Sequence, residues 1–410
     1  MDVFIQETLT RIIVSSFQTA PYWLTIVLGF IFWHMWLAYI HTRNIANLQW
    51  TMLEIKIPRE ISKSPLAMEL VLNALYQRGS INNAIDVYWN GNLTPVFSLE
   101  LVSIEGKVHF FIRTQKFFKK LIEAQIYAQY PTVEVSEVED YTMKVPYGHP
   151  GSDWQMWGAE FILTKPDPYP IKTYVDYGLN KDPKEEFKID PLTAVLEYLG
   201  SIGKGEQIWI QIMVQRTKER FRTPGTWLEK RGWKDETKDL INKLLKDISK
   251  KSKQRTDSDK QFSFTVQTEG EKDIITAVER SITKLGFDCG IRGIYLAREG
   301  VFNAVNVVGL IGSMRQYSSE HLNGFKHTHT TSLDYPWEDF KKIRIGGIKA
   351  RMFDAYKRRS YHYPPYQRKP IILNSEELAT IFHFPGKVAE TPTFARIESR
   401  RAEPPHDLPV

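Results

Sequence analysis

The hydrophobic pattern begins with one uninterrupted apolar run near the N-terminus. Residues 23–40 read WLTIVLGFIFWHMWLAYI and contain no Asp, Glu, Lys or Arg. Because an α-helix rises about 1.5 Å per residue, this run crosses most of a hydrocarbon core about 30 Å thick. Tryptophan and tyrosine in the run suit the membrane interfaces. We therefore predict an N-terminal segment, residues 1–45, that contains one transmembrane helix; a cleaved signal peptide or a buried core helix are the alternatives.

The charges beside this run predict its orientation. Arg43, Lys56 and Arg59 follow the run, whereas Arg11 is the one basic residue before it. Positively charged flanks are retained on the cytoplasmic side of a membrane. We therefore expect a single-pass protein of the cell inner or cytoplasmic membrane, with the long C-terminal part in the cytoplasm.

After the apolar run, the pattern alternates between strand and helix periods. Period-two alternation predicts strands, and apolar residues four apart predict helices. The order over residues 46–150 is βαββαβ, the ferredoxin-like arrangement. The predicted strands are 53–57, 97–101, 108–112 and 133–138, and the predicted helices are 64–75 and 116–130.

The same order is predicted again over residues 151–320. In this second copy a basic, partly helical insertion, residues 217–260, replaces the short turn between the two middle strands. The fold class is therefore α+β, with a transmembrane helix followed by two tandem ferredoxin-like (βαββαβ) sandwiches. The predicted strands are 154–163, 207–214, 261–267 and 291–297. The predicted helices are 190–199 and a segment that starts at the capping-box spacing of Thr268 and Glu271 and extends to Leu285.

Residues 321–410 are predicted to form a mostly irregular, basic and proline-rich arm with one short helix at 375–383. Asn374 and Glu377 have the spacing of a capping box at the start of that helix. The stretch 341–370 carries ten Lys or Arg against one acidic residue, Asp354. Tyrosines 356, 361, 363 and 366 interleave with these charges. Such a pattern suits binding of a single nucleic-acid strand, and equally a segment packed on an acidic surface of this protein or of a partner.

The two basic regions supply the candidate contact residues. Lysine and arginine side chains neutralise phosphates, so DNA or anionic lipid is a candidate partner. The alternative for the insertion is a solvated helix whose charges pair with one another. The candidate residues are Lys250, Lys251, Lys253, Arg255, Arg351, Lys357, Arg358 and Arg359.

Composition and motifs argue against catalysis. The chain has 410 residues, a net charge of +6 and 42% hydrophobic residues, which excludes a mainly disordered or multi-pass membrane protein. A single cysteine, Cys289, excludes an internal disulfide framework. Residues 198–205 come nearest to a phosphate-binding loop but lack its first glycine and its hydroxyl residue. His327 and His329, in a polar loop, have no Cys or carboxylate at ligand spacing.

We therefore expect no catalytic residue, no cofactor and no metal. The alternative is a membrane enzyme with a site assembled between the two sandwiches.

Two long segments resemble a known family. Tyr363–Gly386 reads YPPYQRKPIILNSEELATIFHFPG and continues as ETPTFARIESRRAEPPHDLP, and Phe110–Thr142 reads FFIRTQKFFKKLIEAQIYAQYPTVEVSEVEDYT. They resemble the region before the motor domain of TraC-like conjugation or type IV secretion ATPases of the HerA/FtsK group. Similar membrane-anchored chains of unassigned function carry this region without a motor.

The resemblance implies a membrane-anchored, non-catalytic scaffold or docking component of a conjugation-like or DNA-translocating machine. Its partner would be a separately encoded P-loop ATPase, HerA/FtsK-like or TraC-like, acting in trans, and homo-oligomerisation is a further expectation left open. The alternative is a membrane-proximal DNA-binding protein that uses residues 217–260 and 341–370.

Overall fold

The computed structural model describes most of the chain, in two compact units. One unit contains residues 1–48 and 78–94, and the other contains residues 49–77 and 95–410. Only the backbone is described for residues 2–17, 221–222, 230, 249–256 and 336. The described ranges are 2–58, 63–81, 83–148, 151–180, 190–218, 221–222, 230–256, 268–333, 335–339 and 343–386.

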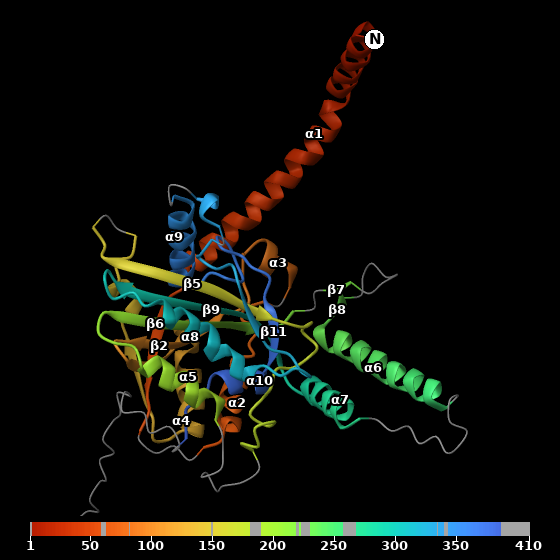
Figure 1. Ribbon diagram of the computed structural model, residues 1–410. Helices are drawn as coiled ribbons and strands as arrows, with labels where there is room; N and C mark the ends of the chain where they lie inside the picture. The colour runs from red at the N-terminus through yellow and green to blue at the C-terminus, as the bar shows by residue number, and fades with distance from the viewer. Residues whose placement is uncertain are drawn as a thin grey trace, which may run out of the picture. The chain divides into compact units, whose positions relative to one another are not determined.

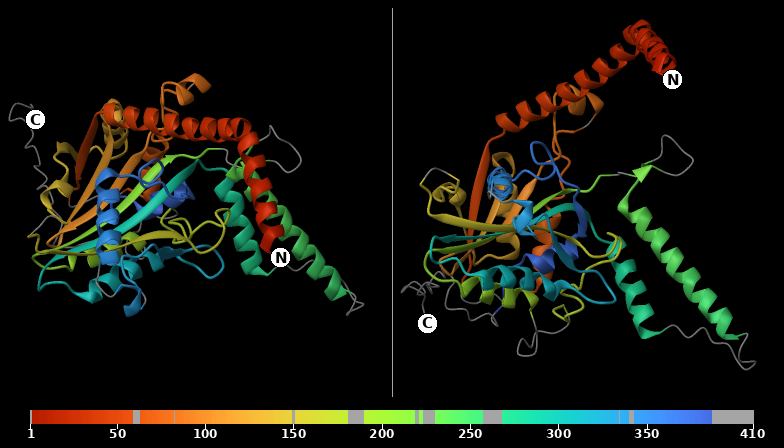
Figure 2. Two further views of the ribbon diagram at one scale, coloured as in Figure 1. Left: turned by 90° about the horizontal axis from the view of Figure 1, so that it is seen from above. Right: turned by 45° about the horizontal axis from the view of Figure 1, so that its top comes forward.

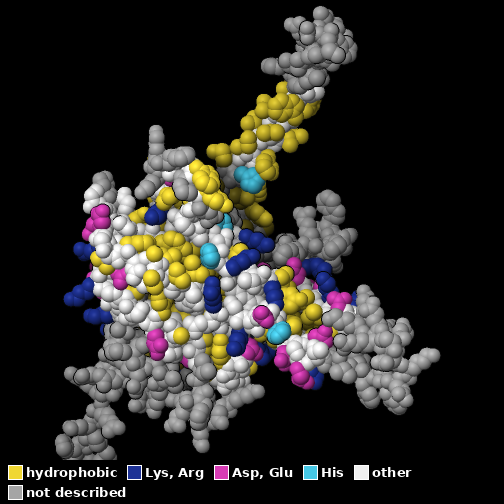
Figure 3. All heavy atoms as spheres, viewed as in Figure 1, with side chains coloured by type: hydrophobic (Ala, Val, Ile, Leu, Met, Phe, Trp, Pro, Cys, Tyr) yellow, Lys and Arg dark blue, Asp and Glu magenta, His cyan; other side chains and the backbone are white. Residues whose placement is uncertain are grey.

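The first unit combines one long helix with one short helix. Helix α1 (Asp2–Asn47) contains the predicted span, and α3 (Ala84–Tyr88) follows much later in the chain (Figure 1). Residues 18–47 form a helix long and apolar enough to cross a membrane. Side chains 21–35 are all exposed, and apolar atoms cover the visible face of this stretch (Figure 3). A helix that is apolar on all sides does not suit a water-facing surface.

The second unit is built on one large antiparallel sheet. Among the described residues, nine strands join it in the order β10-β5-β9-β6-β2-β3-β1-β4, and β11 pairs with β9 beside β5. The strands are β1 (Trp50–Lys56), β2 (Phe97–Ile104), β3 (Lys107–Gln115), β4 (Glu134–Val138), β5 (Trp154–Leu163), β6 (Glu206–Arg216), β9 (Gly286–Arg298), β10 (Phe325–Thr328) and β11 (Ile371–Asn374).

The sheet is covered on both faces. Leu53 and Phe110 point into the larger core, which five helices complete, whereas the adjacent residues Met52 and Phe111 point into a smaller core under α9 (Ile343–Arg358). Neighbouring residues of a strand face opposite sides, so both sets are buried only because both faces are covered (Figures 1 and 2). The five helices are α2 (Pro65–Asn73), α4 (Lys119–Gln129), α5 (Pro191–Gly200), α8 (Ala304–Ser313) and α10 (Ser375–Ile381).

A long insertion separates β6 from β9. It contains the small hairpin β7 (Phe221–Arg222) and β8 (Lys230–Arg231), then α6 (Trp233–Thr256) and α7 (Glu269–Ile282). The capping box formed by Thr268 and Glu271 starts α7. The strand predicted at 261–267 lies outside the described residues.

The α+β class is confirmed, but the sheet differs from the predicted arrangement. Strands of the two predicted sandwiches form a single sheet, because β2 pairs with β6 from Phe97–Val214 to Ile104–Gln207. The strand expected to close the second sandwich, β9, lies between β5 and β6. The sheet ends at β10, in a stretch predicted to be a polar loop. Alternation along one strand indicates which side chains face a core. It does not indicate which other strand accepts or donates the backbone hydrogen bonds, so the sequence did not predict that β2 pairs with β6.

The expectation of a mostly irregular C-terminal arm is wrong for residues 343–386. This part forms α9, β11 and α10, and its apolar side chains enter both cores. The predicted helix at 375–383 is α10, which begins with the predicted capping box of Asn374 and Glu377. The high density of basic residues concealed the buried helical face of α9, formed by Met352, Phe353 and Tyr356.

Candidate functional site

Seven of the eight predicted contact residues lie on two helices, and Arg359 directly follows the second of them. The backbone of Lys250, Lys251, Lys253 and Arg255 continues α6, and their side chains are outside the described part of the structure. The other four lie on or directly after α9, where the structure describes each side chain. Side-chain contacts are therefore described only for the four residues on or after α9.

Helix α9 presents a row of arginines on its exposed face. Arg344, Arg351 and Arg358 are all exposed and lie seven residues apart, which places successive members about 10.5 Å apart along the helix. The Arg358 Nε donates to the Asp354 carboxylate at 2.8 and 2.9 Å. We call these three residues the α9 arginine row. Lys357 lies beside this row, with its Nζ 5.5 Å from the centre of the Phe353 ring.

The aromatic residues predicted to stack on bases are only partly accessible. Tyr356 and Tyr361 are 0% and 1% exposed. Their rings belong to the protein interior, so of the two alternatives stacking on a nucleic-acid strand is excluded for these two residues, and packing within this protein is favoured.

Arg359 is also wrongly predicted as a surface contact. Its side chain is 2% exposed. Two N–H groups donate to Glu100, at 2.9 and 3.1 Å, two donate to Asp140, and the fifth donates to the Lys357 carbonyl at 2.8 Å. A guanidinium has five N–H donors, so none remains for another anion.

Glu100 is the buried anion that this arginine neutralises. It lies on β2, is 0% exposed, and also accepts hydrogen bonds from Ser98, Tyr141 and Gln211. Although burial acts to raise it, the pKa of Glu100 is lowered by the charge and hydrogen bonds of Arg359. The pair is ionised and fully hydrogen-bonded, and it connects β2 to the end of α9. Sequence reasoning missed Glu100 because an acidic residue in an alternating strand looks water-facing.

A second polar cluster fixes α10 to its neighbours. Arg280 of α7 contacts Glu376 at 3.0 Å, and Lys284 contacts Glu69 of α2 at 2.8 Å. Glu377 accepts backbone N–H groups from Asn374 and Ile171, both at 2.8 Å, and burial raises its pKa to about 8. These groups pair with one another, and the described residues contain no group of three or more His, Cys, Asp or Glu arranged to hold a metal.

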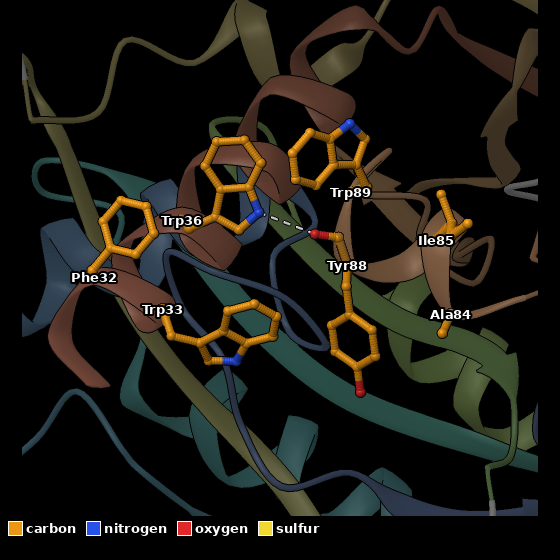
Figure 4. Close-up of a pocket in the computed structure, with 7 residues that line it drawn as sticks. All are labelled: Phe32, Trp33, Trp36, Ala84, Ile85, Tyr88 and Trp89. Carbon is orange, nitrogen blue, oxygen red and sulfur yellow. Dashed lines mark hydrogen bonds between the residues drawn. The ribbon is translucent and has the colours of Figure 1, made fainter. Parts of the chain in front are cut away.

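The first unit contains an apolar pocket of about 390 Å³ between α1 and α3 (Figure 4). Trp36 Nε1 donates to the Tyr88 carbonyl at 3.0 Å, so the indole donor is satisfied within the protein. The Trp33 ring packs against Tyr88, and the Trp36 ring packs against Trp89, with centroids 5.7 and 5.4 Å apart. The lining residues are Phe32, Trp33, Trp36, Ala84, Ile85, Tyr88 and Trp89.

Two further contacts hold the segment that follows α3 against α1. Asn44 Nδ2 donates to Asn92 Oδ1 at 3.2 Å. Gly91 has φ +69°, and a Cβ at this position would lie 2.6 Å from the Ile40 carbonyl oxygen. Glycine is therefore required both by its backbone conformation and by the close approach to α1. Sequence reasoning missed the pocket, since its walls are separated by about fifty residues of chain.

A family model covers most of the chain. The model described as Domain of unknown function (DUF8128) matches residues 45–396. The chain belongs to the DUF8128 family. The DUF8128 match begins at the end of α1 and includes every strand of the large sheet. A search of curated proteins found no match.

Proposed function

We propose that this DUF8128 chain is a single-pass, membrane-anchored and non-catalytic scaffold that docks a separately encoded P-loop ATPase in a conjugation-like or DNA-translocating machine. The observation that carries the anchor is α1. Its residues 18–47 contain an apolar stretch long enough to span and form about 45 Å of helix, against about 30 Å of hydrocarbon core. Only Leu48 and Gln49 separate this helix from β1 of the sheet. The basic flank after the span favours a cytoplasmic sheet unit.

The partner is proposed from the resemblance to TraC-like ATPases. In the structure, the segment 110–142 contributes β3, α4 and β4, and the segment 363–386 contributes β11 and α10. Both segments therefore belong to the framework of the sheet unit. This supports the proposed relationship to the region before the motor; that the motor is a separate chain remains part of the proposal.

We also interpret the sheet as two merged ferredoxin-like units. The first half has the order β2-β3-β1-β4, and the second half has the order β6-β9-β5-β10. Numbered within each half, both orders are second, third, first, fourth, which is the order of a βαββαβ unit. Helix α8 then takes the place of the second helix in the second half. An experimental structure in which the two halves do not superpose would contradict this interpretation.

Co-purification tests the docking function. The full chain is purified from its native membranes in mild detergent, and the bound proteins are identified by mass spectrometry. We expect a P-loop ATPase among the bound proteins. We expect that it no longer co-purifies when the charge of the α9 arginine row is reversed by Arg344→Glu, Arg351→Glu and Arg358→Glu. The matched control is Arg298→Glu, an exposed arginine on β9 outside the row. A monomeric chain without an ATPase would contradict the proposal.

The arginine row also favours a second candidate, direct DNA binding near the membrane. Three phosphates engaged by three arginines give a slope of log K against log salt of about −2.7. Replacing the three arginines by glutamine should flatten this slope, whereas Arg298→Gln should leave it unchanged. Binding that does not vary with salt would exclude this candidate.

A further inference from the structure

Helix α3 exposes large apolar side chains that its size does not explain. Ile85, Tyr88 and Trp89 are 64%, 47% and 70% exposed. The helix is nevertheless well formed, because the side chains of Asn83 and Asp86 cap its first turn reciprocally. A capped helix of five residues that, together with its C-cap Trp89, exposes three large apolar side chains suits an apolar medium better than water.

The contacts of this segment place it at one level of α1. Tyr88, Gly91 and Asn92 contact Trp36, Ile40 and Asn44 in turn, so the segment runs beside two turns of helix. Before residue 36, side chains 21–35 of α1 are exposed on every side. The first charged residue of α1 after this stretch is Arg43. If α1 spans the bilayer, as proposed above, α3 lies where hydrocarbon gives way to head groups, the level at which Trp and Tyr are enriched.

The pocket at this level has the character of a lipid site. Its seven lining residues carry no charged group, and the Trp36 N–H is already bonded to the Tyr88 carbonyl. A volume of about 390 Å³ lies within the range of small-ligand sites, about 300–1,000 Å³. Apolar walls offer water no hydrogen-bond partner. The apolar surface of α1 is continuous with the pocket, since Phe32, Trp33 and Trp36 belong to both.

We propose that α3 is a second membrane contact and that its pocket with α1 holds one acyl chain of a bilayer phospholipid. The exposed side chains of α3 enter the leaflet beside α1, and the bound chain fills the space between Trp33 and Trp89. Residues 78–94 would then fix the level and rotation of α1 in the bilayer. This inference rests on the proposed membrane anchor.

Depth measurement tests the membrane contact. Nitroxide labels are attached to Ile85→Cys and to Trp89→Cys in the full chain carrying Cys289→Ser, in vesicles of phosphatidylcholine and phosphatidylglycerol. Both positions are largely exposed; Trp89→Cys removes the ring contact with Trp36, whereas Ile85→Cys leaves the ring contacts of the pocket in place. We expect greater accessibility to oxygen than to a water-soluble nickel chelate. The control is Phe117→Cys, an 86% exposed residue of the sheet unit, where the order should reverse. Water-like accessibility at both α3 positions would overturn the proposal.

Photo-cross-linking tests the acyl chain. The probe is a phosphatidylcholine with a diazirine on one acyl chain, and a probe labelled on its head group serves as the comparison. We expect the acyl-labelled probe to react with the pocket residues, and the reaction to be lost in Ala84→Trp, which fills the pocket, and in Gly91→Ala, which forces the segment off α1. Unchanged labelling in both variants would refute the site.

Alkaline extraction separates this inference from the anchor. A chain that resists extraction but shows water-accessible α3 labels keeps the anchor and loses the lipid site. A chain that is released by alkali contradicts the anchor itself, and the lipid site with it.

Discussion

Replacing Arg359 by methionine removes the positive charge that holds Glu100 in the interior. The change deletes five hydrogen bonds and leaves a carboxylate with 0% exposure without its counter-charge. Breaking a buried ion pair in this way costs about 3–5 kcal/mol. A typical domain has only about 5–15 kcal/mol of unfolding free energy, so we expect a large fraction of it to be lost.

The assay is urea unfolding of the full chain in detergent micelles, followed by tryptophan fluorescence. Trp209 is fully buried in the same core and reports its opening. The matched control is Arg358→Met, at the residue directly before Arg359. It breaks an exposed ion pair with Asp354 and should lower the unfolding free energy by less than about 0.5 kcal/mol.

A double variant isolates the pair. Glu100→Gln removes the buried charge, so Arg359→Met should cost less in that background, with a coupling of at least about 1 kcal/mol. Equal effects of Arg359→Met and Arg358→Met, or additive effects of Arg359→Met and Glu100→Gln, would refute the claim that the buried ion pair stabilises the fold.

Three further predictions use the same unfolding assay. Arg359 adopts φ +53°, so Arg359→Gly should be less destabilising than Arg359→Met by about 1 kcal/mol; equal costs would contradict backbone strain at this position. Gly290→Ala places a methyl group against the Tyr361 ring and should cost about 1–3 kcal/mol, whereas Gly346→Ala, with open space, should not. Both ring nitrogens of His383 face acceptors, the Ala379 carbonyl and Asp190; burial opposes protonation, but Asp190 raises the pKa of His383 above 6.5. Because the folded pKa is the higher one, the stabilisation is complete below about pH 6.5 and is lost as pH rises through the raised value, so the cost of His383→Ala should shrink at alkaline pH. A cost that does not vary with pH would contradict the charged form.

Local features of the fold were predictable from the sequence. The apolar run 23–40 predicted a membrane-competent helix, which in the structure covers residues 18–47, and capping signals at Thr268 and Asn374 predicted the starts of α7 and α10. Alternation predicted β1, β2, β3 and β6. Each of these signals lies within a few residues of the element that it specifies, so no knowledge of the rest of the chain is needed.

The candidate site was much less predictable. The α9 arginine row is visible as a basic stretch, but its regular spacing has meaning only on a helix whose opposite face is buried. Arg359 looked like its neighbour Arg358, and only Glu100, 259 residues away in the chain, makes it a core residue. The aromatic pocket required a segment near residue 88 to reach Trp36 of α1.

The sequence alone determined the secondary structure of most elements and the presence of one membrane-competent helix. Tertiary structure decided which strands became neighbours, which of the basic side chains were buried, and where the short helix α3 packs. The physical reason is that caps and periodicity are properties of adjacent residues. Strand pairing and charge burial depend instead on the free energy of contacts between segments distant in sequence. Central strands with two apolar faces share the same local pattern, so that pattern does not determine which of them become neighbours.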